Sequence, residues 1–467
     1  MKIILLQIDD ELSRKSAVLA CRRFRGCHTF EKIAEILDNI HSTFGINYRK
    51  ITATVTDNAS NFVKAFRVFN VDLPIHQEEL EVDDDDNDGN SSSTEEVDVF
   101  NFTSPEVALE DEGIRLPNHI RCASHTLSLV CTVDAAKALQ KSPAFSKLNH
   151  SAMGKCSALW TSAGKPKSAE VIQNHLNRQL RYPCPTRWNS LYDSVQIIVE
   201  NKDKINDVMV ALKLPQFKVI EIEFLEEYCI SLKPISNALD RLQSENGCFY
   251  GDLIPTLLMT KQRLSQLESD ARMRHCIPLL HSVTVGFKTR FQKHLSLDTA
   301  VHDAVMASLS HPFFKLRWIS LVKDINELPS DQDQLVKQLQ EQFVLAVKFS
   351  ENEHKTSRMT SSEKNLSRSD REDNFFIFSN SPTEKLCITD GEVQALHFLQ
   401  DTSNDLLSLN KYPAIKRVFL RYNTALPSSA PVERLFSFAG MIHKPKRSRL
   451  SDKLFEYLVF LKGNQQF

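Results

Sequence analysis

The sequence lacks the closely spaced cysteine pairs that build zinc fingers. Its ten cysteines are spread from Cys21 to Cys387, and no two form a C-x-x-C pair, so no zinc finger of that spacing can be read from it. It also lacks an apolar run of about 18 residues, which argues against a membrane-spanning helix. The first ten residues lack the pattern of a secretory signal. We therefore expect an intracellular protein with reduced thiols and no membrane partner.

Glycine and proline are too scarce for a collagen-like or largely low-complexity chain. There are 12 glycines and 18 prolines in 467 residues, and 42% of the residues are hydrophobic. That composition is typical of a protein with packed cores. At roughly 100–200 residues per domain, the length predicts two to four units.

One segment of the sequence has no positively charged residues. Residues 78–112 carry 15 Asp and Glu and no Lys or Arg, which leaves 57 basic against 44 acidic side chains elsewhere. The stretch 82–96 has too little apolar surface to order itself, so we predict an acidic disordered loop over 78–113. The remaining basic surface permits nucleic-acid binding, and the alternative is a solvated lysine-rich surface.

Hydrophobic periodicity predicts α/β structure at both ends of the chain and helices between them. Strands are expected at 3–8, 17–21 and 51–56 (the last one buried), and a short strand is expected to enter a helix within 119–139. Helices are expected over 30–44, 62–69, 195–210, 224–242, 393–407, 430–439 and 451–461. We predict domains at 1–140, 141–350 and 390–467, with a flexible linker at 351–389.

Two carboxylates stand where chemistry often collects. Asp57 follows the predicted strand 51–56, and ligands bind at the carboxyl ends of strands in open α/β sheets. The alternative for Asp57 is a helix cap. Glu433 lies in the first turn of the predicted helix 430–439, beside its apolar stripe. The alternative for Glu433 is a charge that complements the helix dipole.

Two further pairs are candidates for binding. Cys122 and His125 begin a helix at ligand-like spacing, although two ligands do not complete a zinc site, and the alternative is a buried thiol beside a hydrogen-bonded imidazole. Arg187 and Trp188 follow a stiff proline-rich segment. Trp can stack on a base and Arg can grip a phosphate, whereas the alternative is a Trp that anchors helix packing.

The C-terminus combines a basic loop with apolar helices. Residues 443–449 (HKPKRSR) form a candidate phosphate-contacting loop, for which the alternative is a solvated basic loop. The residues of the apolar stripe must cover this chain's own core or a partner's. The basic side chains are Lys444, Lys446, Arg447 and Arg449, and the apolar ones are Phe436, Leu454, Phe455, Leu458 and Leu461.

The order of the motifs carries more information than any one of them. TDNASN at 56–61 is followed by CASH at 122–125, CPTRWNS at 184–190 and SSAPVERLFSFAG at 428–440, and the chain closes with KPKRSRLSDKLFEYLVFL from 444. With KSAVLACRRF at 15–24, this series resembles the hobo–Activator superfamily of DNA transposases, and most closely its animal branch with BED zinc fingers. The resemblance runs from about residue 3 to the end, interrupted by the acidic segment.

The resemblance implies a ribonuclease-H-like core that is split by a long all-helical insertion. In this chain the core is expected to be partial. In the family, an Asp–Asp–Glu triad holds two Mg²⁺ or Mn²⁺ ions that clamp the attacking and leaving oxygens. Asp57 matches the second Asp and Glu433 the Glu, so they form a weak, incomplete metal site. Cys122 and His125 match a motif near the active site, and Arg187 and Trp188 match a pair that handles flanking DNA. The C-terminal helices match the dimerisation region.

The sequence departs from the family at its start. The first Asp and its strand would precede Met1, and Asp9 and Asp10 do not match it. We therefore predict a nuclear, transposase-derived protein that lacks catalysis and a cofactor as given, forms a homodimer or higher oligomer, and is expected to bind double-stranded DNA but no small-molecule substrate. The alternative is an active metal-dependent transposase whose N-terminus is missing from the gene model.

Overall fold

The computed structural model describes residues 1–70, 113–184, 188–245, 247–322, 332–361, 390–443 and 450–465. The predicted acidic loop, residues 78–113, lies outside the described residues except for Gly113. Most of the predicted linker, residues 351–389, also lies outside them. Contacts within the chain define two compact units. Unit 1 holds residues 1–23, 55–58 and 120–467, and unit 2 holds residues 24–54 and 59–119. These contacts divide the chain differently from the predicted domain boundaries.

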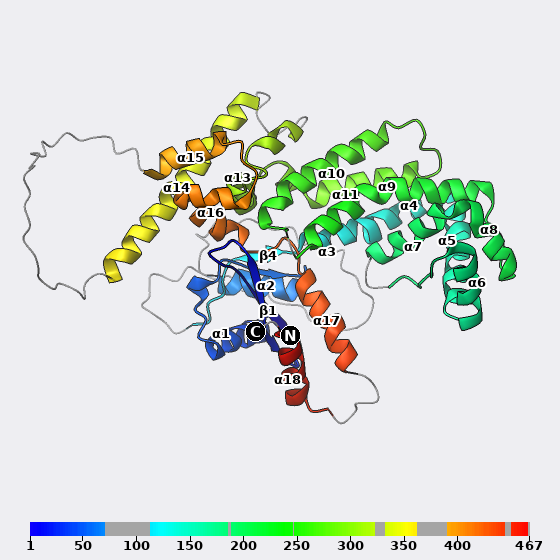
Figure 1. Ribbon diagram of the computed structural model, residues 1–467, viewed down its shortest axis with the longest axis horizontal. Coiled ribbons are helices and arrows are strands. Elements are labelled where there is room, and N and C mark those ends of the chain that lie inside the picture. Colours follow the sequence, from blue (N-terminus) through cyan, green and yellow to red (C-terminus); the bar gives the residue numbers. More distant parts are fainter. Residues whose placement is uncertain are drawn as a thin grey trace, which may run out of the picture. The chain divides into compact units, whose positions relative to one another are not determined.

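Helices dominate the described residues, and the strands are short (Figure 1). The strands are β1 (Lys2–Ile8), β2 (Arg14–Cys21), β3 (Thr54–Thr56) and β4 (His119–Arg121). The helices are α1 (Phe30–Thr43), α2 (Ser60–Phe69), α3 (Ala123–Leu129), α4 (Ala135–Lys141), α5 (Pro143–Ala163), α6 (Pro166–Leu176), α7 (Trp188–Glu200), α8 (Lys202–Ala211), α9 (Val219–Gln243), α10 (Leu253–Glu268), α11 (Ile277–Arg290), α12 (Gln292–Leu295), α13 (His302–Ser310), α14 (Gln332–Ser361), α15 (Asp390–Gln400), α16 (Pro413–Asn423), α17 (Ala430–Ile442) and α18 (Asp452–Gly463). Shorter helical turns are η1 (Tyr48–Lys50), η2 (Val130–Asp134), η3 (Tyr250–Asp252), η4 (Thr299–Val301), η5 (Arg317–Leu321) and η6 (Leu406–Lys411).

The strands form two separate two-stranded sheets in the described residues. β1 and β2 are an antiparallel hairpin, with Ile8 opposite Arg14 and a register shift at Ile3 and Ile4. β3 and β4 run parallel, because the hydrogen bonds join residue 54 to 118 and residue 56 to 122. The prediction of a buried strand over 51–56 is wrong in length and burial. β3 has three half-buried residues, and residues 51–53, between the end of η1 at Lys50 and the start of β3, have no regular secondary structure.

Unit 2 is built on the pair α1 and α2, as the periodicity predicted. Ile33, Leu37 and Ile40 recur on one face of α1 and are buried, and Ala65 and Phe66 are the buried residues of α2. The aromatic ring of Phe66 stacks on His119 at 4.6 Å between centroids. Burial of one apolar stripe against another is what stabilises such short helices.

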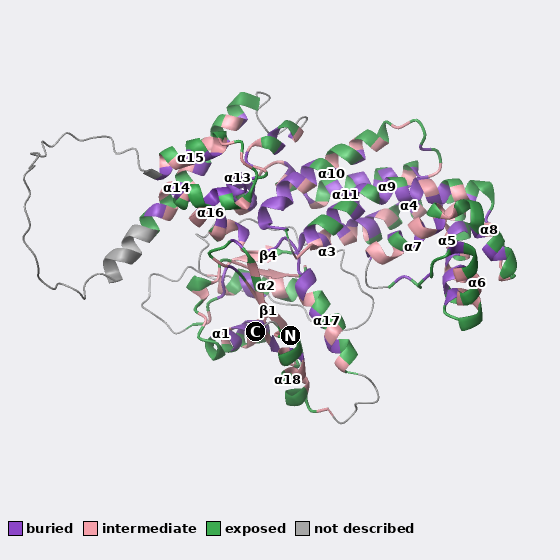
Figure 2. Cartoon of the chain, in the orientation of Figure 1, coloured by how far each residue is buried: buried purple, intermediate pink, exposed green. Residues whose placement is uncertain are grey.

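The helical middle of the chain is confirmed, with changes at several ends. The helix predicted over 195–210 is two helices, α7 and α8, which break at Asn201. The helix predicted over 393–407 stops at Gln400, and α14 continues to Ser361, past the start of the predicted linker. Most buried apolar residues of α3 to α16 form one cluster (Figure 2). Within the described residues, no helix combines the length and apolar character that a membrane crossing requires.

The last four helices of unit 1 pack in two different places. α15 and α16 contact α14, and α16 also contacts α13, so both belong to the helical body. α17 contacts β1, and α18 contacts β2 and α17. A small core of Val18, Cys21, Leu435, Ala439 and Val459 joins this hairpin to these two helices. The partial ribonuclease-H-like core stays a prediction.

Candidate functional site

Three motifs that are far apart in the sequence meet in unit 1. The carbonyl of Thr56 accepts a hydrogen bond from the amide of Cys122 at 2.9 Å, directly before Asp57. The Sγ atom of Cys122 accepts one from the amide of Ser429 at 3.2 Å. The carbonyl of Ser429 in turn accepts the amide of Glu433 at 3.2 Å, in the first turn of α17. A continuous set of hydrogen bonds therefore runs from the residue before Asp57 to Glu433.

Cys122 is the central residue of this junction. It is fully buried at the N-terminus of α3, where its Sγ also accepts the amide of His125 at 3.3 Å. Next to it, the amide of Ala123 donates to the carbonyl of Pro427 at 2.9 Å. The predicted pair of Cys122 and His125 is thus joined by a helix cap made by the thiol. The half-buried His125 side chain lies one turn into α3.

Asn58 extends the junction by a contact that sequence reasoning missed. Its Nδ2 donates to Oγ1 of Thr126 at 2.9 Å, and so ties the turn after β3 to α3. Asn58 Oδ1 and Ser124 Oγ are buried without a hydrogen-bond partner in the described structure. Asn58 belongs to the TDNASN motif and Ser124 to the CASH motif. Their membership of these two motifs is the sequence signal that could have identified them.

The two carboxylates have exposed side chains. Asp57 follows β3 and Glu433 lies on α17, and both are solvent-accessible. The neighbour of Glu433, Arg434, fixes the direction of α17: its guanidinium donates to the carbonyl of Gln243 and pairs with Glu245 at 2.9 Å. Glu433 therefore stands on a helix that is anchored at both its start and its exposed side.

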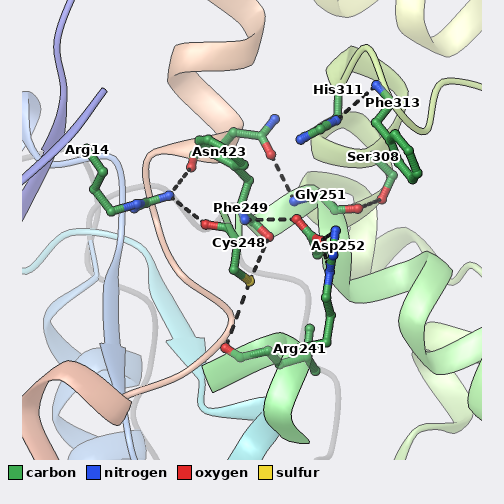
Figure 3. A network of polar contacts seen from close by, with 11 residues as sticks. Arg14, Arg241, Cys248, Phe249, Gly251, Asp252, Ser308, His311, Phe313 and Asn423 are labelled. Carbon is green, nitrogen blue, oxygen red and sulfur yellow. Dashed lines mark hydrogen bonds and ion pairs between the residues drawn. The ribbon is translucent and has the colours of Figure 1, made fainter. Parts of the chain in front are cut away.

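A second network holds the chain just before this junction (Figure 3). Asn423 ends α16 and is fully buried, and its Oδ1 accepts the amide of Gly251 at 2.9 Å. Its Nδ2 donates to the carbonyl of Ala307 and to Ser310 Oγ. A Cβ at Gly251 would lie 2.5 Å from the carbonyl oxygen of Ala307, so the close approach requires glycine.

Arg14 of β2 adds the hairpin to this network. Its guanidinium donates to the carbonyls of Thr424 at 2.5 Å, Cys248 at 3.1 Å and Asn423 at 3.3 Å. Burial lowers the pKa of Arg14, and all three of these acceptors are neutral. The last carbonyls of α16 carry the negative end of its dipole, which favours a cation there. These hydrogen bonds hold the chain at Thr424, four residues before the SSAPVE motif begins at Ser428.

The implied metal ions do not fit the described residues as a complete site. Within those residues, no group of three or more His, Cys, Asp or Glu side chains is placed to hold a metal ion. Asp9, which does not match the first Asp of the triad, has a structural role in the hairpin turn: its Oδ1 accepts hydrogen bonds from the amides of Glu11 and Ser13. The backbone carbonyl of Asp10 accepts a hydrogen bond from Nζ of Lys416. We derive no metal-dependent step.

The predicted DNA-contacting residues have different outcomes. Trp188 is 7% exposed at the start of α7 and packs on Tyr192, with 5.7 Å between the ring centroids. That is the position of a packing anchor, the alternative given above, and its DNA role stays a prediction. Arg187 lies outside the described residues, and so do the four basic residues of the C-terminal loop, Lys444, Lys446, Arg447 and Arg449.

The predicted dimerisation residues divide by exposure. Phe436 is 54% exposed, Leu454 49% and Leu461 66%, whereas Phe455 and Leu458 are half-buried. The residue of α18 that is fully buried is Val459, which contacts the small core on β2. The stripe is therefore shared: one edge docks α18 on its own hairpin, and the other faces solvent.

Comparison with known proteins gives a distant similarity. No family model matches the chain. It is 24% identical over 364 residues to the human zinc finger BED domain-containing protein 4, an alignment that covers 74% of this chain and 29% of that protein. The chain thus spans less than a third of the length of the curated relative it matches. The similarity is to the BED-type kind of protein that the motifs predicted, while membership of the hobo–Activator superfamily stays a prediction.

Proposed function

We propose that this is a transposase-derived nuclear protein that associates with itself through α17 and α18, binds DNA, and does not cleave it. The observation that carries the proposal is a set of exposed apolar residues on the contacting helices α17 and α18, here called the C-terminal face. They are Phe436, whose ring also has Lys2 Nζ above it at 3.7 Å, and Met441, Leu454, Tyr457 and Leu461. Exposed apolar residues on neighbouring helices are typical of protein interaction sites.

The energetics favour an occupant for the C-terminal face. Each Leu or Phe that is fully buried contributes about 1.5–3 kcal/mol, and all five residues are at least 49% exposed. Part of that gain is offset by the cost of association, which is about 4–15 kcal/mol. Two copies that meet by a twofold axis would bury the face twice, and this doubling favours a homodimer over a single bound peptide.

DNA binding rests on charge and on the relative. Outside residues 78–112 the chain carries 57 basic and 44 acidic side chains. A basic protein surface attracts the phosphate backbone without reading sequence. The similar human protein is named for a BED zinc finger, and this supports a nuclear role that involves DNA.

Light scattering of the full chain at micromolar concentration tests self-association. We expect a dimer or higher oligomer for the wild type, and a monomer for Leu461→Asp and for Leu454→Asp, because both side chains are exposed. Leu407→Asp is the matched control, since Leu407 is 57% exposed on η6, outside the C-terminal face. Circular dichroism must show unchanged helicity in every variant. A monomeric wild type, or equal disruption by Leu407→Asp, would contradict the proposal.

A further inference from the structure

Two arginines of unit 2 converge on one tyrosine hydroxyl. Nε of Arg49 donates to Oη of Tyr48 at 3.0 Å, and Nη1 of Arg115 donates to the same oxygen at 3.2 Å. Tyr48 and Arg49 lie in η1, while Arg115 lies 67 positions from Tyr48 in the segment that leads to β4. The fold therefore brings two cations from separate segments to a single neutral acceptor.

This arrangement differs from that of the arginines that pair with a carboxylate. Arg241, Arg290 and Arg272 each hold a carboxylate oxygen at 2.5–2.6 Å. Arg49 and Arg115 make no ion pair within the described residues, and both side chains are exposed. A guanidinium has five N–H donors. The hydrogen bond to Tyr48 uses one donor of each arginine and leaves the others available.

The described residues of unit 2 carry an excess of basic side chains. Residues 44–54, 59–70 and 113–119 contain no Asp or Glu. The described acidic residues of unit 2 all stand on α1, and they are Glu31, Glu35 and Asp38. The same three segments carry the basic residues Arg49, Lys50, Lys64, Arg67 and Arg115. The hydrogen bonds that Arg115 and Arg49 donate to Oη lower the pKa of Tyr48, because they stabilise its ionised form.

We propose that Arg49 and Arg115 form a binding site for a phosphate group, with the Tyr48 hydroxyl as a third donor. A phosphate offers several charged oxygens to two guanidinium forks, and such charge-assisted hydrogen bonds are about twice as strong as neutral ones. The phenol that now accepts both bonds is a weaker, neutral acceptor. Its own O–H can donate to the incoming oxygen. The site lies in unit 2, and Asp57 and Glu433 lie in unit 1.

The phosphate group can belong to a DNA backbone or to free inorganic phosphate. The DNA source rests on the proposed function, whereas the phosphate site itself does not. Binding of free phosphate and binding of DNA are therefore tested in separate experiments, so that a failure of DNA binding does not decide whether the phosphate site exists.

The first experiment uses inorganic phosphate and the full chain. The ³¹P line width of phosphate is measured with wild type, with the double variant Arg49→Gln/Arg115→Gln, and with Arg67→Gln as control. Arg67 is an exposed arginine of the same unit, on α2, and its replacement removes one charge outside the site. We expect the wild type and the control to broaden the line, and the double variant to lose at least about half of that broadening. Equal broadening by wild type and double variant, or equal loss in the control, would overturn the site.

The second experiment measures the salt dependence of binding to a DNA duplex. Each lost phosphate contact lowers the slope of log K against log salt by about 0.9, so the double variant should lose up to about 2 and Arg67→Gln less. A slope that the double variant leaves unchanged would overturn the DNA source and assign the site to free phosphate. The variant pair Arg49→Lys/Arg115→Lys keeps the charge but not the fork. If it binds phosphate as well as the wild type does, the convergent geometry has no role and the proposal fails.

Discussion

The amide of Ser429 donates a hydrogen bond to Sγ of Cys122 at 3.2 Å across 307 positions of sequence. The same sulfur caps α3 through the amide of His125. One thiol therefore joins the start of α3 to the start of α17, and through Thr56 to the residue before Asp57. Positions that look like metal ligands in the sequence are here held together by a structural contact.

Replacement of this thiol should weaken the whole junction. Cys122→Ala leaves the buried amide of Ser429 without its acceptor, and an unsatisfied buried donor costs about 1–3 kcal/mol. Cys122→Ser keeps an acceptor of smaller size and should cost less. Urea unfolding followed by circular dichroism measures both. Equal loss of stability in the two variants would show that packing, and not the hydrogen bond, holds the junction.

The end of α18 should depend on one amide side chain. Asn464 Oδ1 accepts the amide of Val18 at 2.8 Å, and its Nδ2 donates to the carbonyl of Val18 at 2.9 Å, so that it pairs with β2 as a neighbouring strand would. Asn464→Ala should raise hydrogen exchange at Val18 and throughout α18. Asn464→Asp keeps only the hydrogen-bond acceptor, so its exchange rates should lie between those of the wild type and of Asn464→Ala. Unchanged exchange in the alanine variant would contradict this.

Arg14 should contribute more to stability than an ordinary surface arginine. Arg14→Met removes a charged donor from three backbone carbonyls, and hydrogen bonds to charged groups contribute about 1.5–3 kcal/mol each. We expect a lower urea midpoint, with a loss of a few kcal/mol. Arg178→Met is the matched control, because Arg178 forms an exposed pair with Glu200 of the kind that contributes about 0–1 kcal/mol. Similar midpoints for the two variants would contradict the role of Arg14.

His311 should make the protein sensitive to mild acid. It is 7% exposed among the rings of Phe249, Phe314 and Phe419, and burial lowers its pKa to about 3. An unfolded His has a pKa of about 6.5. Below that pH His311 binds a proton in the unfolded state but stays neutral in the folded state. The free energy of unfolding therefore falls as the pH falls from about 6.5 towards 3. From pH 7 to pH 5 the loss is about 2 kcal/mol.

The variant His311→Phe isolates this effect. It removes the titrating group and keeps an aromatic ring, so the fall in unfolding free energy between pH 7 and pH 5 should be smaller by about 2 kcal/mol. The carboxylates that titrate in both proteins cancel in the comparison. An identical pH dependence in wild type and variant would show that His311 is protonated in the folded state.

We predict no Mg²⁺- or Mn²⁺-dependent strand cleavage by the full chain. Of the triad that the resemblance implies, only Asp57 and Glu433 are matched by this sequence, and a two-metal clamp needs more ligands. The measurement is strand cleavage of DNA duplexes that carry the terminal repeats of the transposable element from which the chain is proposed to derive. Cleavage that Glu433→Ala abolishes would contradict the prediction and favour the active-transposase alternative.

Local pattern was sufficient for most of the helices and for the strands β1 and β2, although not for their pairing. Ile33, Leu37 and Ile40 repeat at helical spacing, and the short apolar runs at 3–8 and 17–21 predicted the two strands, because these signals depend only on residues that are neighbours in sequence. The motifs also placed Asp57, Cys122 and Glu433 at element ends, where the structure has them. In contrast, α16 has a clear apolar stripe of Ile415, Val418 and Phe419 that the prediction omitted.

Long-range contacts were decided only by the tertiary structure. Sequence alone could not show that the thiol of Cys122 holds Ser429, that Arg14 closes the end of α16, or that Arg49 and Arg115 meet at Tyr48, because each partner lies tens or hundreds of positions away. Whether an apolar residue of α18 faces the core or solvent was likewise undetermined. Val459 and Leu461 are both apolar and two positions apart, and only the docking of α18 on β2 buries the first and exposes the second.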